Sequence, residues 1–131
     1  MSKFDLPIYG VINKTKNNKN CAITLNWSRA AHYRDYGKAK KQFKLMIYNQ
    51  LRKSDKFKGQ IQIKYTYYAN RAGTDLDNFV GVAKKFFQDA LSESGLIEDD
   101  NVNIIVANSE CYGGIDRENP RVEAEIMTLS R

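Results

Sequence analysis

The chain has 131 residues, of which 42% are hydrophobic and 27% are charged, with two prolines and a formal net charge of +6. A chain of this length supports one hydrophobic core, so we expect a single domain over residues 1–131. This composition excludes disordered and fibrous classes. No apolar stretch approaches the ~20 residues of a membrane span, and the N-terminus has no apolar export segment, so we expect a cytoplasmic protein without membrane contact.

The first half of the chain predicts two strands, one helix and a third strand. Short strands over 7–12 and 21–25 flank the polar, lysine-rich run 13–20, a pattern typical of a hairpin with a long basic tip. In residues 35–53 the apolar residues recur at helical spacing with basic residues between them, which predicts a helix with one cationic side. Residues 60–68 alternate polar with β-branched or aromatic residues, which predicts a half-buried strand.

The second half predicts a core helix and two more strands. Asp75 or Asp77 can cap the helix at its start, and Gly95 can end it. An acidic turn at 96–101, a strand at 102–107, a turn at 112–116 and a strand at 121–129 follow. The order ββαβαββ indicates an α+β two-layer sandwich, a mixed sheet with two helices on one face.

Charge is distributed unevenly along the chain. Residues 1–70 carry fifteen Lys and Arg against three acids, whereas residues 71–131 carry six against twelve. Lys and Arg dominate phosphate binding, and carboxylates are the preferred ligands of hard cations. The pattern therefore favours a protein that binds a polyanion and divalent cations, although a solvated basic helix beside an acidic surface would give the same composition. Cys21 and Cys111 lie far apart and are expected to be ordinary reduced thiols.

Four carboxylates flank the core helix. Asp75 and Asp77 precede it, and Asp99 and Asp100 follow it in the acidic turn. Mg²⁺, or Mn²⁺ as a substitute, binds oxygen ligands and keeps open positions for water and phosphate. A joint site requires the turn to fold back over the start of a helix about 24 Å long. The alternative is that each group is an ordinary helix cap or turn residue.

The order of these residues resembles the signature of the RusA family of Holliday-junction resolvases. The shared pattern is Asp75-Leu-Asp-Asn78, then Lys85-x-x-x-Asp-Ala-Leu91, then Gly95 and the pair Asp99-Asp100. The core of the resemblance runs from about residue 71 to 101. Looser similarity covers 23–25, 32–34 and the terminal strand from 121 to 126.

The resemblance implies a homodimeric, Mg²⁺-dependent endonuclease that binds a four-way DNA junction and nicks two strands symmetrically in recombination and repair. It assigns Asp75, Asp77 and Asp100 as catalytic metal ligands, with Asp99 as an auxiliary neighbour. Metal-bound water would attack the phosphorus, and the cation would neutralise the charge that develops on the phosphate. No organic cofactor is implied. Two symmetric nicks also fit a two-fold dimer with two active sites.

The chain departs from the family pattern at one position. A catalytic lysine usually follows the second aspartate by one helical turn, but Gly81 stands there. Lys85 matches the family block by sequence. Lys84 lies within roughly 20° of Asp77 around the helix, so both lysines are candidates for stabilising the transition state. Ordinary surface lysines are the alternative.

Further candidates would contact DNA rather than the metal. The predicted phosphate contacts are Arg71, Arg34, Arg29, Lys38 and Lys41. Trp27, Tyr33 and Tyr36 could stack on unpaired bases, or could belong to the core or an interface. His32 has no second ligand at metal-binding spacing and is expected to face DNA or solvent. Two other functions remain open: a non-catalytic nucleic-acid-binding module, and a metal-dependent nuclease acting on another branched or linear substrate.

Overall fold

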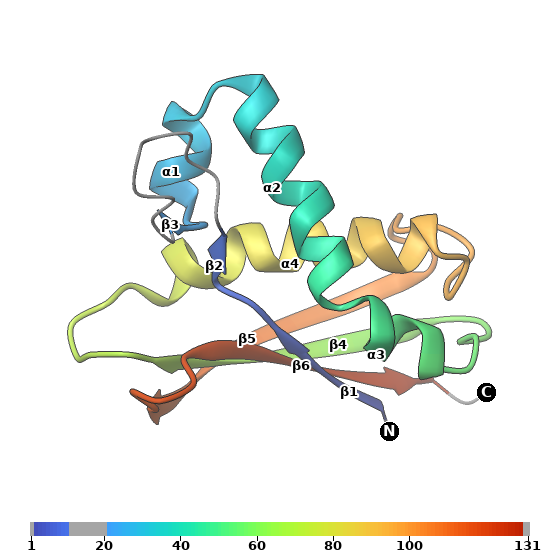
Figure 1. Ribbon diagram of the computed structural model, residues 1–131. Coiled ribbons are helices and arrows are strands. Elements are labelled where there is room, and N and C mark those ends of the chain that lie inside the picture. Colours follow the sequence, from blue (N-terminus) through green and yellow to red (C-terminus); the bar gives the residue numbers. More distant parts are fainter. Residues whose placement is uncertain (1, 11–20, 130–131) are drawn as a thin grey trace.

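The structure is a computed structural model that describes residues 2–10 and 21–129 (Figure 1). Its described part contains six strands and four helices. In chain order these are β1 (Ser2–Leu6), β2 (Tyr9–Gly10), β3 (Cys21–Ala22), α1 (Leu25–Ala30), α2 (Tyr33–Met46), α3 (Tyr48–Lys53), β4 (Ile61–Ala69), α4 (Leu76–Glu93), β5 (Ile105–Ile115) and β6 (Arg121–Thr128). The protein is an α+β two-layer fold, as the sequence predicted.

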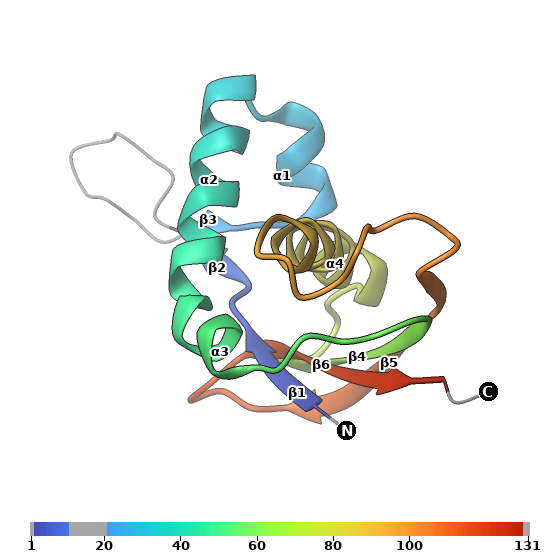
Figure 2. The same ribbon diagram turned by 90° about the vertical axis from the view of Figure 1, so that its right-hand side faces the viewer.

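The main sheet is mixed and has the strand order β1-β6-β4-β5. β6 pairs antiparallel with both β1 and β4, whereas β4 and β5 run parallel. Parallel neighbours need a crossover connection, which α4 provides. β2 and β3 form a separate two-stranded ladder. All four helices lie on one side of the main sheet, with α4 directly against it and α1 and α2 above (Figures 1 and 2).

Alternation along the strands divides the sheet into a buried and an open face. In β4 the odd-numbered residues from Ile61 to Ala69 are buried under the helices, and the even-numbered ones are more exposed. Val122, Ala124 and Ile126 of β6 continue the buried face. One cluster of buried hydrophobic residues joins this face to α2 and α4. The fold therefore has a single core between the sheet and the helical layer.

Helix α4 forms where the sequence predicted the core helix. The Asp75 side chain caps it, and the seven buried residues of its apolar stripe pack between the sheet and α2. Gly95 ends the segment with a φ of 78°, a left-handed conformation that favours glycine. These local signals explain why the sequence alone located this helix well.

The N-terminal third differs from the sequence prediction. Strand β1 and helix α1 were not expected, and the predicted strand 21–25 continues only to Ala22 before α1 begins at Leu25. Thr24 caps α1 by accepting a hydrogen bond from the backbone N–H of Trp27. The predicted hairpin exists as the short β2–β3 ladder, and its basic tip at 13–20 lies outside the described residues.

Two other predictions need correction. The single helix predicted for 35–53 is two helices, α2 and α3, which meet at Ile47, so four helices rather than two cover the sheet. The turn predicted at 112–116 is wrong because β5 continues through it to Ile115. Gly113 fits that strand because an added Cβ would lie 2.6 Å from the Tyr68 ring. A close approach between neighbouring strands, not a turn, accounts for this glycine.

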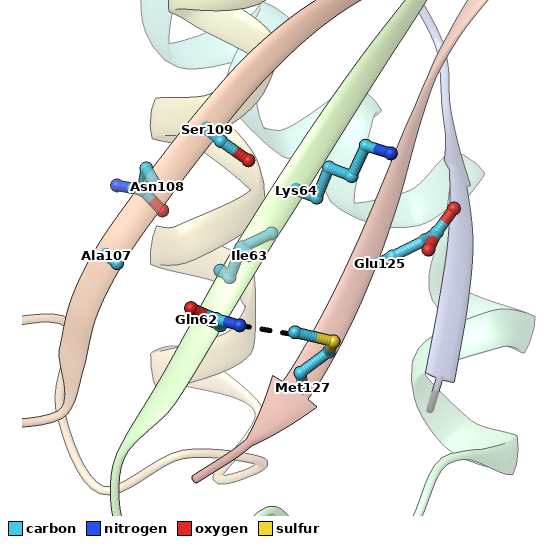
Figure 3. A pocket seen from close by; sticks show the side chains of 8 residues that line it. All are labelled: Gln62, Ile63, Lys64, Ala107, Asn108, Ser109, Glu125 and Met127. Carbon is cyan, nitrogen blue, oxygen red and sulfur yellow. Dashed lines mark hydrogen bonds between the residues drawn. The ribbon is translucent and has the colours of Figure 1, made fainter.

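The open face of the sheet is polar and slightly hollowed. A cavity of about 170 Å³ lies over β4, β5 and β6, with Lys64 and Glu125 on neighbouring strands at its rim (Figure 3). The Gln62 amide lies 4.0 Å from the Met127 sulfur across this hollow. The sheet separates this hollow from the residues of α4. None of the helices in the described residues is long and apolar enough to span a membrane.

Candidate functional site

Asp75 and Asp77 lie together at the start of α4. Asp75 Oδ1 accepts hydrogen bonds from the backbone N–H groups of Asp77 and Asn78, at 3.0 and 3.4 Å. In the described part of the chain, neither Asp75 Oδ2 nor the Asp77 carboxylate has a side-chain partner. Both side chains are exposed, so three carboxylate oxygens remain available. This donor set fits Mg²⁺, which binds few protein oxygens and retains water.

Asn78, the last residue of the Asp-x-Asp-Asn motif, holds the neighbouring helix. Its Oδ1 accepts a hydrogen bond of 3.0 Å from the backbone N–H of Asn26 in the first turn of α1. That N–H belongs to the group of donors that a helix N-terminus leaves without intrahelical partners. The motif therefore fixes α1 beside the two aspartates, a role that sequence reasoning did not assign to Asn78.

Asp99 and Asp100 lie at the opposite end of α4. The Asp100 carboxyl group hydrogen-bonds with that of Asp89, which is twelve residues beyond Asp77 in the same helix. Twelve residues correspond to about 18 Å along a helix axis. The turn does not fold back over the start of the helix, and within one chain the four flanking aspartates form two separate pairs. No cluster of three or more potential metal ligands occurs in the residues that the structure describes.

The carboxylates at the C-terminal end are already engaged by protein groups. Asp99 accepts hydrogen bonds from the Asp100 backbone N–H and the Asn101 side-chain amide. Burial raises the pKa of Asp100, and its hydrogen bonds with Asp89 and Asp99 raise it further. Burial also raises the pKa of Asp89, but hydrogen bonds from Lys40 and Lys85 outweigh it and leave that pKa below its ordinary value. This end is a compact network of acids and lysines.

The packing of Leu25 explains why position 81, one turn after Asp77, holds glycine rather than lysine. A Cβ atom at position 81 would lie 2.8 Å from Cγ and Cδ2 of Leu25, which packs against α4 from α1. Any larger side chain would have to displace the Leu25 side chain. The glycine is a packing residue, and the absence of a lysine at this position follows from the helix that covers it.

Both candidate lysines, Lys84 and Lys85, form ion pairs within the protein. Lys84 Nζ lies 2.8 Å from Glu110 Oε1 on β5. Lys85 Nζ lies 3.1 Å from Asp89 Oδ1, so the Lys85-x-x-x-Asp89 part of the motif is an i,i+4 ion pair along the helix. Lys84 is the nearer of the two to the line of Asp77 around α4, and its ion pair joins the helix to the edge of the sheet.

The basic residues divide into paired and unpaired groups. Lys40 of α2 forms ion pairs with Asp89 and Glu93 of α4, and Lys44 forms one with Glu93. These pairs neutralise part of the cationic side that the sequence predicted for this helix. Among the described residues, four of the predicted DNA contacts are exposed and have no ion pair: Arg29, Arg34, Lys41 and Arg71. Lys38 is also exposed.

The aromatic candidates have different environments. Trp27 stacks on Tyr36 with ring centroids 6.1 Å apart, and Tyr36 contacts Phe86 of α4, so these two rings join α1 and α2 to the core. Tyr33 is 72% exposed at the turn between α1 and α2. His32 caps α2 by accepting from the Arg34 backbone N–H, and it contacts the Tyr33 ring. Arg34 Cζ lies 5.7 Å from the centre of the Tyr33 ring, and Tyr33 is the most exposed of the three aromatic candidates.

No protein-family model matches this chain, and no curated protein is similar to it at a significant level.

Proposed function

We propose that the protein is a Mg²⁺-dependent endonuclease of the RusA type that resolves four-way DNA junctions as a homodimer. The observation that carries the proposal is the pair Asp75 and Asp77, exposed at the start of α4 with three carboxylate oxygens not used by the protein. The exposed Arg71 precedes this pair in the connection from β4. A hard cation and a phosphate group can therefore be bound side by side.

The helical layer provides a surface for the DNA. Arg29 and Arg34 flank the exposed Tyr33 at the α1–α2 turn, and α1 is fixed beside the aspartates by Asn78. Arginine side chains bind phosphates, and an exposed aromatic ring can stack on an unpaired base at a junction centre. The exposed arginines and aromatic ring of this surface favour a nucleic acid over a small molecule.

The proposed dimer gives a role to the aspartates at the other end of α4. A two-fold axis that sets the α4 helices of two protomers antiparallel brings Asp75 and Asp77 of one to the end that holds Asp99 and Asp100 of the other. Each dimer would then contain two acidic sites related by the axis. Two equivalent sites are what paired nicks on opposite strands require.

In this proposal, a bound Mg²⁺ supplies a water of lowered pKa and neutralises charge on the scissile phosphate. Asp75 and Asp77 would hold the cation, and Asp100 of the second protomer would complete its ligands once its hydrogen bond with Asp89 opens. Arg71 positions the phosphate. Lys84 and Lys85 are the candidates for stabilising the charge of the transition state. Lys84 can reach a bound phosphate only if its ion pair with Glu110 opens.

The test compares cleavage of a labelled four-way junction with cleavage of the matching linear duplex in Mg²⁺. The native chain should give paired, ligatable nicks in the junction only. Asp77→Asn should lose at least about a hundredfold in rate, which corresponds to ~3 kcal/mol of transition-state stabilisation, while junction binding survives. Glu125→Gln is the control because it removes a carboxylate on the open face of the sheet, away from α4 (Figure 3). Equal rates for the native chain and Asp77→Asn would exclude the proposed metal site.

A non-catalytic junction-binding module is the second candidate. It is favoured by Gly81 packed under Leu25 and by the ion pairs of both candidate lysines. Without a mobile lysine beside the metal, the surface would bind DNA but cleave it poorly. Junction binding by the native chain without Mg²⁺-dependent nicks would support this alternative. Cleavage of linear, flap or RNA substrates at comparable rates would instead indicate a nuclease of different specificity.

A further inference from the structure

The outer edge of β5 is open along its whole length. β5 spans eleven residues and, among the described strands, pairs only with β4. Its sequence, Ile105-Val-Ala-Asn-Ser-Glu-Cys-Tyr-Gly-Gly-Ile115, contains no lysine, arginine or proline. Its one charged residue, Glu110, is paired with Lys84 of the same chain. Natural proteins usually protect an open edge with charges, prolines, bulges or a short strand. β5 is long, has no proline and carries one charge, which is already paired, and its pairing with β4 is irregular at two points.

The opposite edge of the sheet is protected. β1 spans five residues, and two of them, Lys3 and Asp5, are charged and exposed. Lys3 lies 3.2 Å from Glu123 of the adjacent strand, which keeps an ammonium group at this edge. One sheet thus has a blocked edge and an available one. That asymmetry indicates that β5 pairs with another strand.

A second copy of the same strand is the partner that fits. A two-fold axis perpendicular to the sheet keeps the helical layers of both copies on the same side. A β5 residue that faces the helices in one copy therefore lies opposite a β5 residue that faces the helices in the other. Asn108 and Glu110 face α4, because they contact Gln88 and Lys84. In every possible antiparallel register, the two-fold axis therefore passes beside one residue of β5, and that residue lies opposite the same residue of the second copy.

Side-chain pairing selects one register. An axis beside Glu110 would oppose the two Glu110 carboxylates and the two Lys84 side chains, which is destabilising. An axis beside Ser109 instead sets Glu110 opposite Asn108 of the second copy. Asn108 Oδ1 already accepts from Gln88, so its amide N–H groups remain to donate to that carboxylate.

Two further features are compatible with the axis beside Ser109. The register of β5 against β4 is regular from Ala107 to Tyr112, between two irregularities, so Asn108, Ser109 and Glu110 all lie in its regular part. By residue count, the same axis brings Val106 of one copy opposite Tyr112 of the other, with Val106 at the irregularity between Ile105 and Ala107. Both side chains are exposed in the single chain, at 39% and 54%, and aromatic rings pair well with β-branched residues across strands.

We propose that two copies of this chain join through β5 in antiparallel register about Ser109 and so form one continuous sheet. This inference rests on the homodimer of the proposed function but not on its chemistry. The two α4 helices would then lie antiparallel on the same side of the continuous sheet. The interface specifies the surface, the partner and the register of the dimer.

Engineered disulfides test the register directly. With Cys21 and Cys111 changed to Ser, Ser109→Cys should form an intermolecular disulfide rapidly under mild oxidation. Facing Cα atoms in an antiparallel pair lie about 4.5–5.5 Å apart, within disulfide range. Lys3→Cys on the blocked edge is the matched control and should remain unlinked. Equal cross-linking at both positions, or none at position 109, would overturn the proposal.

Sedimentation equilibrium tests the energetics without engineered cysteines. Asn108→Asp keeps the oxygen that accepts from Gln88 but puts two like charges opposite each other at two symmetric places. Its dimer dissociation constant should rise about tenfold. Asn119→Asp makes the same exchange away from β5 and should leave the constant unchanged. A native chain that stays monomeric, or an unaltered constant in Asn108→Asp, would refute β5 pairing. A β5 dimer that fails to cleave DNA would refute only the nuclease.

Discussion

The two ends of α4 both carry aspartates but use them in opposite ways. At the N-terminal end, backbone hydrogen bonds and the packing of α1 on Gly81 hold the structure, and most carboxylate oxygens stay available. At the C-terminal end, Asp89, Asp99 and Asp100 are engaged by lysines, amides and one another. Asp75 and Asp77 are therefore available for a ligand, whereas Asp100 must first release Asp89 before it can complete the proposed metal site. Four substitutions test this difference, and they follow in order of decreasing expected effect.

Gly81→Lys introduces a lysine where the RusA pattern has one, and it should destabilise the N-terminal end of α4. Its side chain must displace Leu25, and overpacking of this kind costs about 1–3 kcal/mol. Urea denaturation measures the loss. Gly81→Ala should also destabilise the native chain. In a Leu25→Ala background the clash is relieved, so the same Gly81→Ala change should become neutral or stabilising because alanine favours helix. An equal loss in both backgrounds would show that Leu25 is not the cause.

Asp89→Asn should weaken the C-terminal end by about 1–2 kcal/mol. The substitution removes a mostly buried carboxylate that forms ion pairs with Lys40 and Lys85. The expected loss lies between the values for surface and for fully buried ion pairs. The pKa of Asp89 is lowered in the folded chain. Its contribution to the free energy of unfolding is therefore complete above the pKa of the unfolded chain, and it is lost as pH falls through the pKa of the folded chain. The difference between native and variant stability should therefore shrink on acidification. A difference that is constant with pH would point to packing instead.

Asp75→Ala should cost about 1 kcal/mol because it removes the cap of α4. Asp75→Ser keeps an oxygen that can accept from the same backbone N–H groups, so it should retain most of the stability. It nevertheless removes the proposed metal ligand. Thermal unfolding and junction cleavage, measured on both variants, separate the two roles. Full cleavage by the serine variant would limit Asp75 to capping.

Asp100→Asn should give the smallest change, a gain of no more than about 0.5 kcal/mol at neutral pH after solvent screening. The pKa of Asp100 is raised in the folded chain, so its ionised form opposes folding above that pKa. Asparagine removes the repulsion and can donate to Asp89. The gain should disappear as pH falls and the native Asp100 becomes protonated. A loss of stability at neutral pH would contradict this sign.

The comparison of sequence and structure separates local from distant features. The helix from Asp75 to Gly95 and the strands around 60–68 and 121–129 were predicted closely, because spacing, capping and alternation act within a few residues. Helix α1 was missed since six residues are too few for a periodic signal. Strand β5 was cut short because its glycines read as a turn, whereas Gly113 makes room for Tyr68 of the neighbouring strand.

The same division applies to the candidate site. The sequence by itself determined which residues could bind a cation, where the helix begins and ends, and that one half of the chain is basic. Only the tertiary structure decided that the aspartates lie in two groups about 18 Å apart along one helix, that Leu25 packs on Gly81, and that β5 keeps an open edge. The physical reason is that a helix is a rigid rod. Its two ends can meet only through another element or, as we propose, another copy of the chain.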